Sequence, residues 1–182
     1  AIDTLKGKGP ADFVELCLTL GSQMLIAGGK AEDSEAAEAM LKAAIADGSA
    51  LRKLAEFVEA QGGDSQAVYH PEMLPKADII QPVPALESGY VSHIVCDEVG
   101  ICSLLLGGGR ETKESEIDLS VGLVLCKKVG DYVKEGEALA MIHANDPERA
   151  AEAGRRYQKA CTISPEKPDA APIIKGIVRV VQ

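Results

Sequence analysis

The chain of 182 residues is long enough to bury one or two hydrophobic cores. Hydrophobic residues make up 46% of it and charged residues 26%, an ordinary composition for a globular protein in which no apolar run reaches the length of a membrane span. A formal net charge of −9 argues against nucleic acid or an anionic membrane as the main partner, although a small phosphorylated ligand needs only local positive charge.

The first residues, Ala1-Ile2-Asp3, have neither an initiator methionine nor a helix cap ahead of them. This pattern is typical of the end of a helix that starts upstream. We therefore expect a fragment of a longer polypeptide. Removal of a methionine that preceded alanine is the alternative, and the sequence leaves it open.

Three helices connected by short linkers are predicted next, as one helical block. The first, over residues 10–29, starts with a proline in its first turn and ends at two glycines. Apolar residues nearly encircle it, so we expect it to be well buried. The second covers residues 34–48 and stops at a glycine. The third covers residues 49–63, with Ser49 as its cap and two glycines at its end.

A proline-spaced connector follows the helical block. The residue before a proline avoids helical backbone, so this stretch is expected to be extended. The prolines are Pro71, Pro75, Pro82 and Pro84. We place a domain boundary here, with a helical part over residues 1–80 and a mixed part over residues 81–182.

Strands alternate with two helices beyond the boundary. Asp97 is expected to cap a helix over residues 98–106, and Asp146-Pro147-Glu148 is a strong start signal for a helix that runs to about Cys161. The strands are predicted over residues 90–96, 121–126, 138–143 and 173–181.

The stretch Leu104-Leu105-Leu106-Gly107-Gly108-Gly109-Arg110 is the strongest functional signal in the chain. Three consecutive glycines lose much backbone freedom on folding, so they indicate positive φ angles, a close approach or movement. A phosphate-binding glycine loop leads into a helix N-terminus, whereas these glycines follow a helix. The patterns of a P-loop and of a dinucleotide fold do not occur. A site for a nucleoside triphosphate or a dinucleotide is therefore rejected.

Two interpretations of the glycines remain. One is a helix C-cap that continues into a solvated loop, with Gly107 left-handed and Arg110 near the negative end of the helix. The other is a flexible flap that closes over a neighbouring site. The residues alone favour the C-cap, because glycines are common at helix ends.

A strand–turn–strand pattern surrounds two turn pairs, Gly130-Asp131 and Glu135-Gly136, with Val133 and Leu139 expected in the interior. The pattern resembles the turn of biotinyl and lipoyl carrier domains, which present a modified lysine in a hairpin. No such hairpin is present, and Lys127-Lys128 lies on the wrong side of the turn. We therefore expect the β fold without the prosthetic group.

Five cysteines occur without a Cys-x-x-Cys pair, and most lie in apolar runs, which predicts buried free thiols in a reducing cytoplasm. The histidines are isolated and lack metal-ligand spacing, so no metal site is predicted. The cysteines are Cys17, Cys96, Cys102, Cys126 and Cys161, and the histidines are His70, His93 and His143.

Several motifs in one order resemble the pyrimidine-nucleoside phosphorylases and thymidine phosphorylases. They are Thr19-Leu20-Gly21-Ser22, Leu105-Leu106-Gly107-Gly108-Gly109-Arg110-Glu111-Thr112-Lys113, Ile117-Asp118-Leu119-Ser120-Val121-Gly122, and the stretch from Lys127-Lys128-Val129-Gly130-Asp131 through His143-Ala144-Asn145. The resemblance runs from Ala1 to Gln182 and corresponds to the C-terminal portion of a family member only.

The resemblance implies a pentosyltransferase. Family members cleave uridine, thymidine or deoxyuridine with inorganic phosphate, giving free base and a pentose 1-phosphate. The phosphate- and base-binding residues of the family, and the ligands of its structural monovalent cation, precede Ala1. No catalytic or metal residue is therefore assigned here, no cofactor is expected, and the isolated chain is predicted to be inactive. The implied partners are nucleoside, phosphate, the N-terminal part of the same polypeptide and a second subunit of a cytoplasmic homodimer.

The resemblance also implies a fold of α/β (α+β) class. Residues 1–80 become the helical flank of a central α/β domain, and residues 81–182 become a barrel-sandwich-like β domain with appended helices. The candidate substrate-closure loop consists of Gly107, Gly108, Gly109, Arg110 and Lys113. The two cations either favour closure around an anion or pair with surface carboxylates, namely Glu111, Glu114 or Glu116. The alternative is a non-enzymatic module for binding or assembly, with the hammerhead-like fold of the biotinyl and lipoyl carrier domains. This alternative explains the turn pattern but not the ordered motifs.

Overall fold

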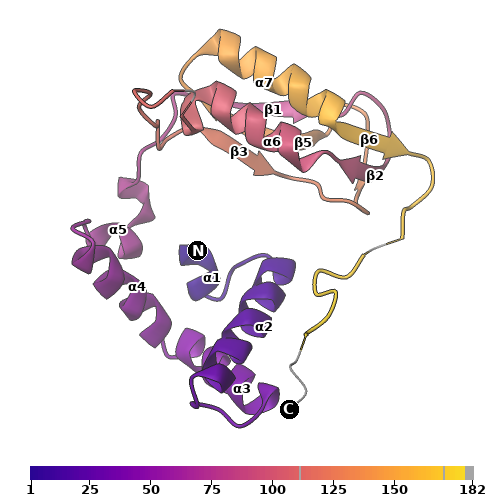
Figure 1. The fold of residues 1–182 in the computed structure, drawn as a ribbon. Coiled ribbons are helices and arrows are strands. Elements are labelled where there is room, and N and C mark those ends of the chain that lie inside the picture. Colours follow the sequence, from indigo (N-terminus) through magenta and orange to yellow (C-terminus); the bar gives the residue numbers. More distant parts are fainter. Residues whose placement is uncertain (111, 170, 179–182) are drawn as a thin grey trace. The chain divides into compact units, whose positions relative to one another are not determined.

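The structure, a computed structural model, describes residues 1–110, 112–169 and 171–178 (Figure 1). The chain divides into two compact units. One holds residues 1–73 together with the tail from residue 172, and the other holds residues 74–171. The assignment of residues 1–80 and 81–182 to two different domains of a longer protein stays a prediction.

The first unit is helical, and the three predicted helices are confirmed as α2, α3 and α4. Helix α2 packs against α3, and α3 against α4. Among the described residues no helix is long and apolar enough to cross a lipid bilayer. The elements of this unit are α1 (Ile2–Leu5), α2 (Ala11–Ala27), α3 (Ser34–Ala46), α4 (Ser49–Ala60), α5 (Gln66–Tyr69) and the 3-10 turn η1 (Pro71–Met73).

The expectation that α2 is well buried is wrong. Within this fully described helix only Ser22 is buried, while Leu20 and Met24 are 56% and 74% exposed. Gly21 of α2 faces α3, where an added Cβ would lie 2.8 Å from Leu41 Cδ1. One face of α2 is covered by α3, so the apolar residues elsewhere on its circumference remain in contact with solvent.

The predicted caps have mixed outcomes. Asp146 does cap α7 (Pro147–Ala160), since its Oδ1 accepts from the backbone N–H groups of the first turn. Ser49 and Asp97 do not cap, because each lies inside a first turn. The N-cap of α4 is Gly48, with φ +74°, and that of α6 (Cys96–Ser103) is Val95.

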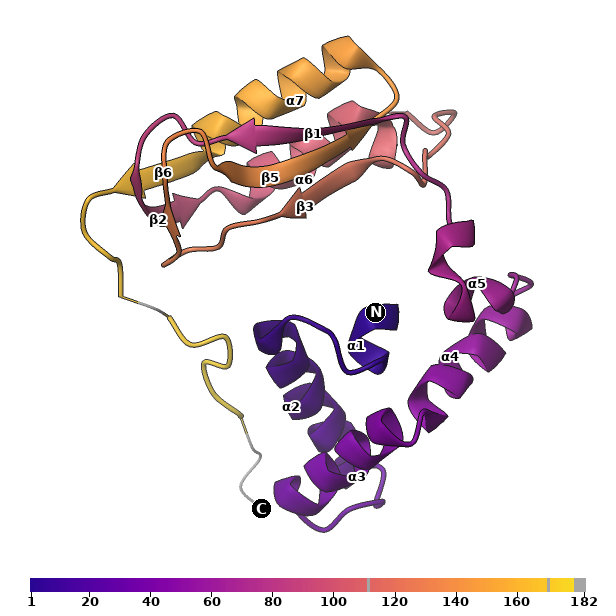
Figure 2. The ribbon, with the colours of Figure 1, turned by 180° about the vertical axis from the view of Figure 1, so that it is seen from behind.

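The second unit contains, among its described residues, two three-stranded antiparallel sheets, with orders β1-β5-β3 and β4-β2-β6. Helices α6 and α7 pack together and lie on one face of the first sheet; Figure 2 shows the strands in front of them. The chain is therefore of mixed α+β class. The strands are β1 (Ile79–Pro84), β2 (Gly89–Ile94), β3 (Gly122–Leu125), β4 (Tyr132–Val133), β5 (Ala138–Ala144) and β6 (Cys161–Ser164).

Strands β2, β3 and β5 confirm three predictions, and β4 lies between the two predicted turn pairs, but β1 and β6 were not foreseen. Strand β1 contains Pro82 and Pro84, which suit it because an edge strand can lack N–H donors on its outer side. The predicted strand over residues 173–181 is wrong for the described residues 173–178, where no strand forms and Val178 is 99% exposed. Extended backbone becomes a strand only where a neighbouring edge pairs with it. Residues 179–181 lie outside the described part.

The core of the second unit brings strands and helices together. Its largest fully buried side chains are Tyr157, Ile142, Val91, Val133 and Cys102. Burial of Val133 and Leu139 confirms the interior predicted from the turn pattern.

The prediction that the cysteine thiols are buried is wrong for most of the five cysteines. Cys102 is buried and Cys161 is half-buried, but Cys17, Cys96 and Cys126 are exposed. An apolar sequence neighbourhood does not decide which face of an element points inward.

Candidate functional site

The glycines lie at the end of α6, as helix polarity predicted. After Ser103 the helix widens into a single π turn, η2 (Leu104–Gly108), and Gly107 within it has φ +102° and ψ 5°. L-residues rarely adopt that backbone conformation, so Gly107 has the positive φ expected of it. At Gly108 a Cβ would lie 2.8 Å from Ser103 Oγ and 3.1 Å from the Ser103 carbonyl oxygen, so a side chain there would require Ser103 to shift. We call residues 107–109 the glycine segment.

Two hydrogen bonds hold the end of the helix in place. The carbonyl of Gly107 accepts from the backbone N–H of Asp118 at 2.9 Å. The carbonyl of Leu105 accepts from Arg149 Nη1 at 3.3 Å. Both acceptors belong to the last carbonyls of a helix, which need partners from outside it. The capped first turn of α7 places Arg149 for this contact.

Asp118 is the centre of a polar cluster with Ser120 and Asn145, which we call the Asp118 cluster. Asp118 Oδ1 accepts from the backbone N–H of Ser120 at 2.9 Å and from its hydroxyl at 2.6 Å. Asp118 Oδ2 accepts from Asn145 Nδ2 at 2.7 Å, and that nitrogen also donates to Ser120 Oγ at 2.9 Å. Asn145 Oδ1 accepts in turn from the backbone N–H of Asp78 at 2.8 Å.

The donors around Asp118 favour its ionised form. The Ser120 side chain contributes most, followed by the Ser120 backbone and Asn145, and together they hold the pKa of the Asp118 carboxyl below its usual value. The cluster therefore offers an acceptor-only carboxylate surrounded by donors at neutral pH.

Arg110 and Lys113 are exposed on the loop that follows the glycine segment. Neither forms a hydrogen bond or ion pair with any residue in the described part of the chain, so no pairing with Glu114 or Glu116 is present there. Glu111, the other expected partner, lies outside the described residues. The structure thus places the three glycines together at the helix end and the two cations on the loop beyond it.

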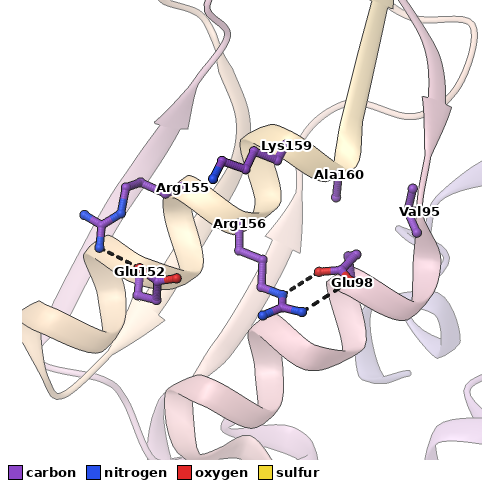
Figure 3. A pocket seen from close by; sticks show the side chains of 7 residues that line it. All are labelled: Val95, Glu98, Glu152, Arg155, Arg156, Lys159 and Ala160. Carbon is purple, nitrogen blue, oxygen red and sulfur yellow. Dashed lines mark hydrogen bonds and ion pairs between the residues drawn. The ribbon is translucent and has the colours of Figure 1, made fainter.

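A second charged feature is a hollow of about 320 Å³ beside the start of α6 and the C-terminal half of α7 (Figure 3). Arg156 donates through Nε and Nη2 to the Glu98 carboxylate, and Arg155 pairs with Glu152 at 2.6 Å. The hydrogen bond to Glu98 raises the pKa of Arg156. Both guanidinium groups thus have carboxylate partners, and the Arg156–Glu98 pair joins α7 to α6.

No group of three or more His, Cys, Asp or Glu side chains within the described ranges is arranged to hold a metal ion.

Comparison with known proteins identifies the second unit. Residues 90–164 match the family described as pyrimidine nucleoside phosphorylase C-terminal domain. This chain carries that domain. The pyrimidine-nucleoside phosphorylases of Staphylococcus aureus (strain USA300) and Staphylococcus haemolyticus (strain JCSC1435) are 53% and 55% identical to it over 145 residues. Each alignment covers 80% of this chain and 34% of the relative, so the chain spans about a third of the length of the curated relatives it matches.

The resemblance to this family is thereby confirmed, and the domain contains the features described above. The glycine segment, the Asp118 cluster, Arg149 and the Glu98–Arg156 pair all lie within residues 90–164. Sequence reasoning did not assign a role to Asp118, Asn145 or Arg149. The first two stand in motifs that carried the resemblance, which was the available signal. Nothing in the sequence indicated that Arg149 reaches Leu105.

Proposed function

We propose that this chain is the C-terminal part of a pyrimidine-nucleoside phosphorylase, a pentosyltransferase that uses uridine, thymidine or deoxyuridine. The observation that carries the proposal is 53% identity, over 80% of the chain, to a protein of that name. The order of the matching motifs and the position of the glycine segment after a helix support it.

In the proposed reaction a phosphate oxygen forms a bond to the anomeric carbon of the pentose while the N-glycosidic bond breaks. The electron pair of that bond leaves with the pyrimidine, which takes up a proton to become the free base. Such a site must neutralise the phosphate, hold the sugar and stabilise the departing base as charge develops on it. We assign these tasks to residues outside this chain, so the isolated chain is inactive.

The proposed contribution of this chain is closure. Gly107, Gly108 and Gly109 form the base of a loop that presents Arg110 and Lys113, two exposed cations, to the anionic co-substrate. A closing loop excludes water and completes the charge environment of a site. Both side chains are exposed, so an anion can reach them.

The remaining architecture follows from the same proposal. Residues 1–80 serve as the helical flank of a central α/β domain, and residues 81–182 form a barrel-sandwich-like domain with appended helices. The exposed apolar side chains of α2 support this arrangement, because such surface is normally covered in a finished protein. The working assembly is a homodimer.

A direct assay tests the proposal. The full-length protein that carries this chain and the isolated chain are each incubated with uridine or thymidine, with and without phosphate, and free base is measured by chromatography. We expect phosphate-dependent release from the full-length protein and none from the isolated chain. Base release by the isolated chain would contradict its predicted inactivity. No release by the full-length protein would favour the hammerhead-like binding module, which the buried Val133 and Leu139 of the turn pattern also fit.

A further inference from the structure

We infer that Asp118 is a positioning residue for the glycine segment: its carboxylate, locked by Ser120 and Asn145, fixes the backbone N–H that holds Gly107. The inference rests on the proposed function, in which the loop after Gly107 closes over the substrates. It assigns to the Asp118 cluster a role that does not involve contact with substrate.

The contact with the glycine segment is made by the main chain. The Asp118 N–H donates to the carbonyl of Gly107 at 2.9 Å. Gly107 is the residue with φ +102°, where helical backbone ends. A hydrogen bond to this carbonyl orients the peptide plane between Gly107 and Gly108. The position of Asp118 therefore decides the direction in which the chain leaves α6.

The side chain of Asp118 connects that contact to the sheet. Strands β1 and β5 are paired, with Ile79 opposite Ala144. The residues flanking this pair, Asp78 and Asn145, are joined by a hydrogen bond, and Asn145 then donates to the Asp118 carboxylate. An unbroken series of hydrogen bonds thus runs from the strand ends to Gly107.

The cluster also closes the base of the loop that carries the cations. Residues 108–117 leave the helix at Gly107 and return at Asp118, with Arg110 and Lys113 between these points. Fixing both ends of a loop reduces the number of conformations that it samples. A loop restrained in this way presents its charged groups with less ordering cost when ligand arrives.

The hydrogen-bond pattern of the cluster is directional, which makes it testable. Asp118 only accepts, whereas Asn145 donates to Asp118 and accepts from Asp78. In Asp118→Asn an amide NH₂ faces either the Asn145 donor or the two Ser120 donors, so at least one hydrogen bond is lost. In Asn145→Asp a second carboxylate faces the first. The double variant exchanges the two groups. It restores the contact between positions 118 and 145 with its direction reversed and keeps the acceptors for Ser120 and Asp78, so only the hydrogen bond from position 145 to Ser120 Oγ stays lost.

The test compares the two single variants and the double variant in the full-length protein. We expect each single variant to lower kcat for phosphorolysis about tenfold and to change either KM less than about twofold, because a misplaced loop weakens contacts made in the transition state. The double variant should recover most of the lost rate. Single variants with unchanged kinetics, or a double variant no better than either single one, would overturn the inference.

A second readout does not depend on activity. Trypsin cleaves after Arg110 and Lys113, and we expect faster cleavage there in both single variants than in the parent and the double variant. Glu116→Gln is the matched control, because it removes one carboxylate from the same loop without touching the cluster, and it should change neither rate. If the full-length parent lacks phosphorolysis, the proposed function fails, while the cleavage rates still test whether Asp118 positions the glycine segment. Equal cleavage rates in all variants would overturn that inference.

Discussion

The helices of residues 1–73 and the mixed unit of residues 74–171 differ in what holds them together. In the mixed unit, Tyr157, Ile142 and Val133 are completely buried in one core. In the helical unit the fully or nearly buried apolar side chains are small, and Leu20 and Met24 face solvent. The mixed unit therefore carries its own hydrophobic core, whereas the described helices bury only small apolar side chains.

The largest effect should come from emptying the core of the mixed unit. Ile142→Ala removes a fully buried side chain whose Cδ1 lies against Gly154 of α7. We expect a loss of about 3 kcal/mol in the free energy of unfolding. The matched change Leu20→Ala in α2 should cost less than about 1 kcal/mol, because that side chain is mostly exposed. Urea unfolding measures both. Similar losses at the two positions would contradict the conclusion that the two units differ in their hydrophobic cores.

A smaller effect is expected at the helix end of the mixed unit. Gly107→Ala forces a Cβ onto a residue with φ +102°, and we expect a cost of about 1–3 kcal/mol. The control is Gly100→Ala, inside α6, where an added Cβ meets open space. That change should stabilise by about 0.5–1 kcal/mol, the difference in helix propensity. Thermal unfolding of the two variants should move in opposite directions, and a shift of the same sign would contradict the assigned backbone conformation.

The hydroxyl of Tyr157 tests whether packing alone stabilises the core. It is buried beside the Cys161 thiol, a weak hydrogen-bonding group, and burial raises the pKa of Tyr157. Tyr157→Phe removes a weakly satisfied polar group and keeps the ring, so we expect a change of less than about 1 kcal/mol, toward greater stability. A clear loss of stability in urea unfolding would show that the contact of the hydroxyl with Cys161 stabilises the core.

The smallest effect is one of pH, and it is absent near neutrality. The pKa of the Asp118 carboxyl is lowered by folding, mainly through Ser120, so the cluster contributes its full stability above the ordinary value of 3.8 and loses it as pH falls through the folded-state pKa. Amide exchange of the glycine segment, corrected for its intrinsic pH dependence, should accelerate only below about pH 4. Asp118→Asn should remove this acid-dependent step. Acceleration between pH 5 and 8 would exclude Asp118 as its origin.

Local signals account for the parts of the fold that could be predicted. Apolar periodicity and glycine stops located α2, α3 and α4, and the Asp146 start signal located α7. The caps at Ser49 and Asp97 failed, because capping depends on the residue at which the path of the chain lets a helix begin. Helix α4 begins at Ser49 itself, with Gly48 as its N-cap, and the Ser49 N–H donates to Asp47 Oδ1 at 2.7 Å.

Pairing between distant segments could not be predicted in the same way. The prolines of β1 concealed a strand that exists because β5 offers it an edge. The strand predicted from residue 173 did not form over the described residues, although its composition is strand-like. Strand formation depends on a partner supplied by the tertiary fold, and composition does not reveal that partner.

The sequence by itself determined that the three glycines end a helix, which excluded a phosphate cradle, and its ordered motifs led to the family. Only the tertiary structure decided what holds the glycine segment. Asp118 and Asn145 lie 27 positions apart, and Arg149 lies 44 positions from Leu105. Helix signals can be predicted because they act between residues a few positions apart, whereas these hydrogen bonds exist only after the sheet and helices have brought the distant segments together.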